Sequence, residues 1–372
     1  MNSHTYNPPS SRSVVRIVHF NNIANDALHY VLALRRYGAD ACLVFERGAH
    51  EFSRPEWEQP DVVREDWVRS VDNLSGKVGL IGLRSAKVVL ELSKYDLISA
   101  WDVGPIWAQW ARRPLIAHTA GGDLFAAAAS RTPRQRLLRR AYEHANCLVY
   151  YLPYQEKTIA HLKVRKLVFA RLPLDESRYS PGPVPDKFSE LRSSGTLFFC
   201  PSRHNWELKG TDIMLKAFAD VLKVERDVRL VLVSWGGDLM RSRALSEELG
   251  LRDKITWMQP LDKGDLIGMY RTCDVVLDQF ILGSYGTTTI ESLMCGKPVL
   301  IRVEGYEPHY GGDLPLVNVR DEDSIAKSMI ELAEDHSMIR VKGDQSRQWA
   351  LMHHSYKSVS AEYMKLASEV VG

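Results

Sequence analysis

Short apolar runs alternate with amphipathic segments along most of this chain of 372 residues, and this alternation restricts the fold more than any other feature. Residues 25–38 show the amphipathic pattern of a helix, and Gly38 fits its C-terminal stop. Alternation of this kind predicts parallel sheets whose strands are joined by right-handed crossovers. In the first half, the runs expected to form buried strands are 14–20, 40–45, 96–101, 114–118, 147–152 and 166–170.

A proline-rich segment, residues 180–188, separates these runs from a second series of the same kind. A chain of this length exceeds a single hydrophobic core, so we expect two domains. Each should be a doubly wound, Rossmann-like α/β unit, with ligands at the carboxyl ends of its strands and in the cleft between the domains. The second series of expected strands is 196–202, 228–234, 254–258, 274–280 and 298–303.

The composition is that of an ordinary globular protein, with 45% hydrophobic and 25% charged residues. The formal net charge of +2, from 48 basic and 46 acidic residues, argues against a dedicated nucleic-acid-binding protein. No apolar run approaches the roughly 18 residues that a membrane-spanning helix needs. Residues 1–13 are polar and lack the apolar core of a secretory signal, so we expect a disordered tail.

The five cysteines show no CxxC spacing and lie mostly in apolar runs. This pattern favours buried thiols in a reducing compartment over disulfides or metal ligands, and it predicts a cytoplasmic protein. The cysteines are at positions 42, 147, 200, 273 and 295.

Residues 279–300 read as the end of a strand, a Gly/Ser/Thr loop and a short helix that Gly296 terminates. The free N–H groups and the dipole of such a helix favour a phosphate at its start. Glu291 lies about one turn into the helix, and helical side chains lean toward the N-terminus. Its carboxylate could therefore accept hydrogen bonds from sugar hydroxyls, which suits a nucleotide or a sugar nucleotide. The alternative is an ordinary turn with a solvated glutamate.

Residues 198–218 read as an apolar strand, a polar loop and a helix for which Thr211 or Asp212 is the expected N-cap. The loop contains Arg203 and Lys209. Two cations at the end of a strand suit a diphosphate leaving group, because they stabilise the charge that develops as the bond to the sugar breaks. The alternative is a pair of solvated surface charges.

The order of these segments resembles the large GT-B family of retaining glycosyltransferases, group 4. That family carries an Arg–Lys pair and an E-x7-E segment that runs into EAMACGKPV-like sequence. Here the pair corresponds to Arg203 and Lys209, and residues 291–299 read ESLMCGKPV. The glycine-containing loop at 283–286 lies between these two segments.

The first half of the chain resembles the acceptor domain of the same family, in residues 113–124, 138–155 and 172–181. Residues 344–370 resemble the family's helix that crosses back to the first domain. The expected organisation is a tail at 1–13, an acceptor-binding domain at 14–180, a nucleotide-sugar-binding domain at 181–345 and a crossing helix at 346–372.

The resemblance implies transfer of a sugar from a UDP- or GDP-linked donor to a hydroxyl acceptor, with retention of configuration and without a metal or other cofactor. Arg203 and Lys209 would then do the electrostatic work that Mg²⁺ does elsewhere. Glu291 would hold the ribose diol, and the backbone of the loop would bind phosphate. The residues expected to bind the nucleotide sugar are Glu291, Gly283, Ser284, Gly286, Thr287 and Thr288.

The chain departs from the family pattern in two places. Gly283 stands where the first glutamate of E-x7-E is expected. Asp278 is a possible substitute for that acid, or it simply ends its strand. The first loop, residues 21–30, lacks the usual glycine pair, although the small Ala24 and Asn25 could still let backbone approach a ligand.

Two polar residues lie at and shortly after the end of the strand expected at 114–118. His118 matches a family histidine that touches the donor sugar, where it could donate a hydrogen bond or act as an acid or base. A structural histidine is the alternative. Asp123 could act as a general base or accept a sugar hydroxyl, or it could cap the helix after the Gly-Gly turn.

Five arginines crowd residues 131–140, together with Leu137 and Leu138. Such a segment could lie on an anionic membrane, which suits a peripheral enzyme with a lipid-linked acceptor at the inner membrane face. A solvated basic helix face is the alternative.

Two other functions fit the same architecture. A sugar-nucleotide epimerase would need an acid and a base on either side of the sugar, for which the candidates are His118 with Asp123 or Asp278. A non-catalytic sugar-nucleotide-binding partner would be consistent with the missing glutamate at Gly283.

Overall fold

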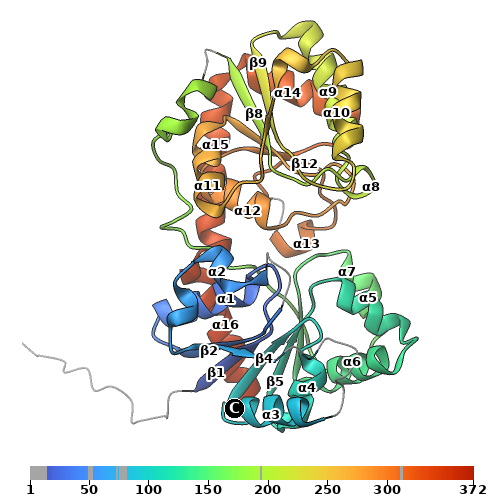
Figure 1. Ribbon diagram of the computed structural model, residues 1–372, viewed down its shortest axis with the longest axis vertical. Coiled ribbons are helices and arrows are strands. Elements are labelled where there is room, and N and C mark those ends of the chain that lie inside the picture. The colour runs from blue at the N-terminus through green and yellow to red at the C-terminus, as the bar shows by residue number, and fades with distance from the viewer. Residues whose placement is uncertain (1–14, 49–52, 73, 75–81, 193–194, 311–312) are drawn as a thin grey trace, which may run out of the picture.

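The computed structural model contains two doubly wound α/β domains, each built on a parallel sheet, which confirms the predicted fold class (Figure 1). It describes residues 15–48, 53–72, 74, 82–192, 195–310 and 313–372. The tail expected at 1–13 lies outside these described residues.

The first sheet has the order β3-β2-β1-β4-β5-β6-β7, and all its pairings are parallel. Its strands are β1 (Arg16–Phe20), β2 (Asp40–Glu46), β3 (Val68–Val71), β4 (Leu97–Trp101), β5 (Leu115–His118), β6 (Cys147–Tyr150) and β7 (Leu167–Phe169). The helices of this half are α1 (Asp26–Arg36), α2 (Pro55–Glu58), α3 (Leu83–Leu92), α4 (Pro105–Ala108), α5 (Gly122–Ala129), α6 (Pro133–His144) and α7 (Gln155–Ile159), with 3₁₀ turns η2 (Val62–Arg64) and η3 (Gln109–Ala111).

The second sheet has the order β10-β9-β8-β11-β12-β13 and is also parallel. Its strands are β8 (Thr196–Cys200), β9 (Val228–Val233), β10 (Ile255–Met258), β11 (Val275–Leu277), β12 (Val299–Ile301) and β13 (Val317–Asn318). The helices are α8 (Trp206–Lys209), α9 (Thr211–Val224), α10 (Leu239–Glu248), α11 (Lys263–Thr272), α12 (Thr287–Met294), α13 (Glu307–Tyr310), α14 (Glu322–Glu334), α15 (His336–His354) and α16 (Tyr356–Val371), with 3₁₀ turns η4 (Asp186–Leu191) and η5 (Arg252–Lys254).

The expected strands all form, and the structure adds two that the sequence did not predict, β3 and β13. Both lie at an edge of their sheet. In β3, Arg69 and Ser70 are exposed, so the strand lacks the continuous apolar run of a central parallel strand. All five cysteines are free; four are buried and Cys42 is partly exposed.

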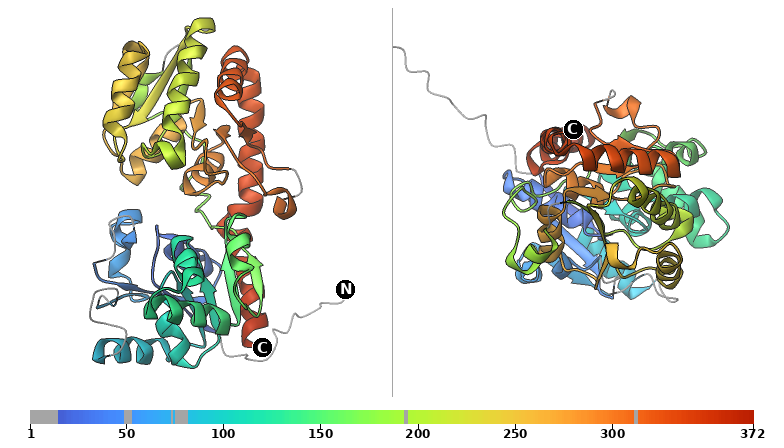
Figure 2. Two further views of the ribbon diagram at one scale, coloured as in Figure 1. Left: turned by 90° about the vertical axis from the view of Figure 1, so that its right-hand side faces the viewer. Right: turned by 90° about the horizontal axis from the view of Figure 1, so that it is seen from above.

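The chain returns to the first domain through its last two helices. Figure 2 shows α15 along the second domain and α16 along the first. The helix breaks at Ser355, whose side chain caps α16 by accepting a hydrogen bond from the Ser358 N–H. From there α16 packs Val359, Tyr363 and Ala367 into the core beneath α1.

Arg347 on α15 forms hydrogen bonds to the segment between β7 and η4, which joins the two domains. Its guanidinium donates hydrogen bonds to the carbonyl oxygens of Tyr179 at 2.7 Å and Glu176 at 2.9 Å, and to that of Met294. One side chain thus connects α15, the interdomain segment and α12.

We expect Arg347→Ala to lower the free energy of unfolding by about 2 kcal/mol, because three partly buried carbonyl oxygens lose their donor. Denaturant melts would measure this loss. Arg340→Ala, on an exposed position of the same helix, is the matched control and should melt like the wild type. Equal stability of the two variants would show that the Arg347 contacts contribute little.

Candidate functional site

A cavity of about 240 Å³ lies between the domains and is lined by residues of both. Its walls include segments that follow β1, β5, β6 and β7 in the first domain and β8 and β11 in the second. These are carboxyl ends of parallel strands, where doubly wound folds bind ligands. Polar residues in the lining include Asp26, Thr119, Gln155, Lys209, Gln279, Ser284 and Thr287.

Lys209 reaches this cavity from the end of the short helix α8. Its Nζ donates a hydrogen bond to Gln279 Oε1 at 2.7 Å and lies 3.7 Å from Asp278 Oδ1. The next residue, Gly210, is the N-cap of α9 in a left-handed conformation with φ of 67°. A Cβ there would lie 3.2 Å from the Cβ of Phe280. The expected N-cap at Thr211 or Asp212 is therefore wrong, because the tight turn requires glycine.

The N-terminus of α12 opens beside Lys209. Gly286 is its N-cap, and among the described residues no side chain caps it. Ser284, Gly286 and Thr287 line the cavity, whereas Gly283 and Thr288 are outside the lining. Free N–H groups beside a lysine make this corner suited to a phosphate or another anion.

Arg203, the other predicted cation, is exposed and does not line the cavity. Within the described part of the chain, its guanidinium has no hydrogen bond or ion pair. The structure thus brings Lys209, Ser284, Gly286 and Thr287 together and leaves Arg203 on the surface of the same loop.

Asp278 is buried and acts as an anchor. Its two oxygens accept hydrogen bonds from Ser202 at 2.6 Å and Thr289 at 2.7 Å. Asp278 therefore connects the loop after β8 to α12. It also lies 3.7 Å from the ammonium group of Lys209. This geometry favours a positioning role for Asp278 over substitution for the missing glutamate.

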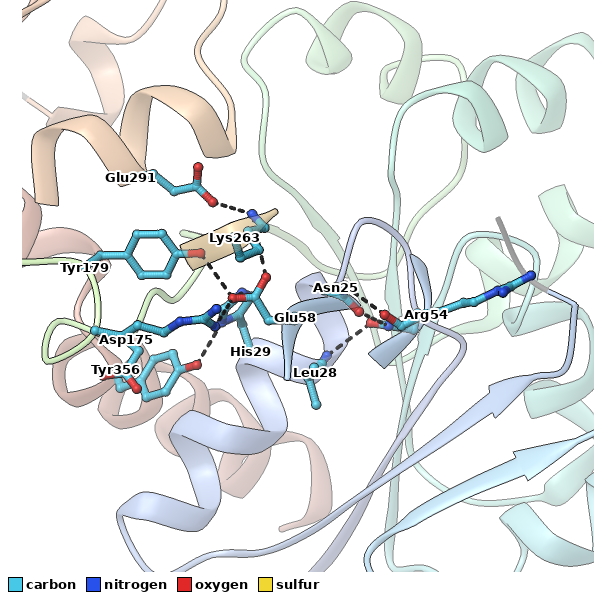
Figure 3. A network of polar contacts seen from close by, with 12 residues as sticks. Asn25, Leu28, His29, Arg54, Glu58, Asp175, Tyr179, Lys263, Glu291 and Tyr356 are labelled. Carbon is cyan, nitrogen blue, oxygen red and sulfur yellow. Dashed lines mark hydrogen bonds and ion pairs between the residues drawn. The ribbon is translucent and has the colours of Figure 1, made fainter. Parts of the chain in front are cut away.

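Glu291 is buried, with only 2% of its surface exposed, so the solvated alternative is wrong. Its Oε1 accepts from Lys263 Nζ at 2.5 Å, and its Oε2 accepts from the Tyr270 hydroxyl at 2.9 Å. Figure 3 shows Lys263 between Glu291 and Glu58, which comes from the first domain. Lys263 and Glu58 were not predicted from the sequence, because no local pattern connects either residue to Glu291.

His118 is fully buried in the first domain and does not line the cavity. Its Nε2 lies 2.6 Å from the Ser99 hydroxyl and its Nδ1 lies 2.6 Å from the Tyr151 hydroxyl, and its ring stacks on Trp101. Burial lowers the pKa of His118 well below its ordinary value, so the ring is neutral. These buried contacts favour the alternative interpretation, in which His118 is a structural histidine.

Asp123 also points into the protein. It accepts hydrogen bonds from the Ala120 N–H at 3.0 Å, from the Thr119 hydroxyl at 3.2 Å and from the Tyr142 hydroxyl. Burial raises the pKa of this carboxyl, and these donors counteract the rise. These contacts hold the turn at Gly121 that starts α5. Asp123 itself lies inside α5, whose N-cap is Gly121 without a side-chain cap from the described residues, so the capping alternative is wrong.

The loop after β1 replaces the family's glycine pair with other residues in left-handed conformations. Asn21, Ala24 and Asn25 have φ of 70°, 49° and 66°. The Asn22 side chain stabilises this loop by donating to Asn25 Oδ1 at 2.6 Å. The loop places Asp26, at the start of α1, in the cavity lining. Its position after a strand was the signal that could have identified it.

Burial raises the pKa of Asp26 to about 8, and the charge of Lys263 opposes this rise. Folding therefore takes up a proton at Asp26 from about pH 4, its ordinary pKa, to about pH 8, and stability falls as the pH rises through that window. We expect Asp26→Asn to raise Tm relative to the wild type at about pH 9 and to leave it unchanged at about pH 4. Thermal melts at the two pH values measure this, and a pH-independent difference would contradict it.

Neither a metal cluster nor a membrane span stands out in the described ranges. No group of three or more His, Cys, Asp or Glu side chains there is arranged to hold a metal ion. Among the same residues, no helix has the length and apolar character needed to cross a bilayer.

Residues 186–349 match the family described as Glycosyl transferases group 1. The D-inositol 3-phosphate glycosyltransferase of Corynebacterium jeikeium (strain K411) is 28% identical over 154 residues, which cover 35% of this chain and 36% of that protein. The chain thus spans about a third of the length of that relative. The GDP-mannose-dependent alpha-(1-6)-phosphatidylinositol monomannoside mannosyltransferase of Mycolicibacterium smegmatis is 23% identical over 306 residues, which cover 74% of this chain and 78% of that protein.

Solved structures share the whole architecture. Anabaena HepE, in complex with UDP and glucose, superposes with a TM-score of 0.74 at 16% identity and covers 95% of this chain and 99% of its own. WaaG, a glycosyltransferase involved in lipopolysaccharide biosynthesis, has a TM-score of 0.62 at 12% identity, covering 94% and 99%. In fold and in its C-terminal sequence the chain therefore resembles the GT-B glycosyltransferases of group 4, and residues 186–349 carry a glycosyl transferases group 1 domain.

Proposed function

We propose that this protein is a glycosyltransferase that moves a sugar from a nucleoside diphosphate to a hydroxyl acceptor, with retention of configuration. One observation carries the proposal: the cavity between the domains combines Lys209 with the uncapped start of α12. Both favour an anion at one corner, and the opposite wall belongs to the other domain. The relatives named above support the same reaction class.

In the proposed reaction, the donor diphosphate lies against Lys209 and the N–H groups at Gly286 and Thr287. Negative charge develops on the diphosphate as its bond to the sugar breaks, and fixed positive groups lower the barrier to that step. Arg203 would add its charge from the same loop, which requires its exposed side chain to turn toward the bound donor. These groups would replace a metal ion, so no cofactor is part of the proposal.

The acceptor would bind on the side of the first domain. Asp26, Thr119 and Gln155 line the cavity there and offer polar groups to hydroxyls. Glu291 would hold the ribose of the donor, as its place in α12 suggests. The similar structure of HepE contains UDP, whereas the similar mannosyltransferase depends on GDP-mannose. Titration calorimetry with UDP and with GDP would therefore identify the base of the donor directly.

We expect Lys209→Ala to reduce turnover by about 10²–10³ while changing donor affinity much less, because the lysine acts on charge that develops during the reaction. Arg203→Ala should act in the same direction. Sugar release and transfer from UDP- and GDP-linked donors would be measured in excess EDTA. Lys216→Ala, an exposed lysine on α9, is the control.

Near-wild-type turnover in both variants would contradict the assignment of the cations, and loss of activity in EDTA that Mg²⁺ or Mn²⁺ restores would contradict metal independence. Conversion of the donor sugar without acceptor would identify an epimerase instead. Nucleotide binding without turnover on any acceptor would identify a binding partner.

We further propose that the basic segment 131–140 attracts anionic membrane lipid. Leu138 of α6 is buried in the core, so the apolar side of this helix faces the protein and cannot contact a bilayer. Arg139 pairs with Glu143 at 3.0 Å. Arg131, Arg136 and Arg140 remain exposed, and an attraction would therefore be electrostatic.

We expect the protein to co-sediment with anionic but not neutral vesicles at low salt. Replacing Arg131, Arg136 and Arg140 with Gln should remove this binding, at about 1 kcal/mol per residue, and leave nucleotide affinity intact. Replacing the exposed Lys216, Lys327 and Arg340 of the second domain is the matched control. Equal sedimentation with both vesicle types would make α6 an ordinary solvated helix.

A further inference from the structure

Lys263 lies between two buried acids that come from different domains (Figure 3). Its Nζ is 2.5 Å from Glu291 Oε1, in the second domain, and 3.6 Å from Glu58 Oε2, in the first. Glu58 and Glu291 each expose only 2% of their surface. Lys263 therefore forms ion pairs with both acids, and its ammonium group lies much closer to Glu291.

Glu58 has further partners on its other oxygen. Its Oε1 accepts from Arg178 Nη1 at 2.6 Å and from the Tyr179 hydroxyl at 3.1 Å, and it lies 3.7 Å from His29 Nε2. Burial raises the pKa of Glu58, but His29, Lys263 and Arg178 outweigh it and hold this pKa well below the ordinary range. Glu58 is therefore a fixed negative charge.

The two acids differ in how well they are satisfied. Both oxygens of Glu291 accept hydrogen bonds, from Lys263 and Tyr270. By contrast, Glu58 Oε2 is buried and accepts no hydrogen bond from any described residue. An unsatisfied buried acceptor is costly, so a lysine that moved toward Glu58 would gain there part of what it lost at Glu291.

A ribose that binds Glu291 must compete with Lys263 for the carboxylate. Displacing the lysine into a site without a partner would leave a buried charge unpaired, at a large cost. Glu58 Oε2 offers that partner at 3.6 Å. We propose that Lys263 is an exchangeable counter-ion, which passes from Glu291 to Glu58 when the ribose hydroxyls of a nucleotide bind.

This inference rests on the proposed function, because it assumes that Glu291 receives the ribose. It assigns Lys263 and Glu58 as positioning residues, which act on the ligand through Glu291. It also predicts a specific dependence: Glu58 should matter for nucleotide binding only when there are ribose hydroxyls to bind and a lysine to displace.

The experiment compares a ribonucleotide with its 2′,3′-dideoxy analogue by titration calorimetry, using UDP or GDP according to which binds the wild type. In Glu58→Gln the lysine has no second acid, so the ribonucleotide should bind roughly tenfold more weakly. The dideoxy analogue requires no exchange, and its affinity should be unchanged. Glu369→Gln, which removes a surface partner of Lys166, is the matched control and should affect neither ligand.

Lys263→Met provides the second arm, because it removes the ion that is exchanged. Adding Glu58→Gln to this variant should cost no further affinity for the ribonucleotide. A tenfold loss that persists in this background, or an equal loss for both nucleotides, would overturn the exchange and make Glu58 a structural residue. If Lys263→Met does not fold, the comparison of the two nucleotides decides alone. Failure of the wild type to bind either UDP or GDP would instead overturn the proposed function, and the exchange with it.

Discussion

A positive charge that is largely removed from water must be held by an opposite one. Lys263, whose side chain is 18% exposed, meets this requirement with buried acids from both domains. The contact to Glu58 reaches across the interface, whereas the contact to Glu291 stays within the second domain. Ile290, the neighbour of Glu291, lines the cavity. One side chain therefore connects the first domain to α12, the helix whose start lines the cavity.

The parallel sheets explain why the site forms at the interface. In a parallel sheet, all loops that lead from a strand to the next helix lie at the carboxyl ends of the strands. Loops of this kind from both sheets line the same cavity. One side offers Lys209 and the start of α12, and the other offers the loop after β1 with Asp26. A ligand long enough to use both must contact both domains.

Much of this arrangement follows from local sequence. Alternating apolar runs predicted both sheets except one edge strand of each, β3 and β13. Position after a strand placed Lys209 and Thr287 correctly in the lining. Position alone could not decide the role of His118, because its burial depends on Ser99, Trp101 and Tyr151 from neighbouring strands. Lys263 could not be predicted for the same reason, because its ion pair with Glu58 joins residues that are distant in sequence.

The glycine at position 283 then acquires a physical interpretation. Its φ of 71° suits glycine, and a Cβ there would come no closer than 3.7 Å to Glu304, so backbone conformation and not space favours the residue. Without an acid at this position, Asp26 is the one acidic residue among the described residues that line the cavity. The second domain thus contributes no carboxyl to the described lining, and the one lining carboxyl belongs to the first domain. Because burial raises the pKa of Asp26 to about 8, this carboxyl is protonated at neutral pH and can donate a hydrogen bond to a ligand in the cavity. A ligand held at Lys209 would reach that carboxyl only if the two domains approach each other closely enough.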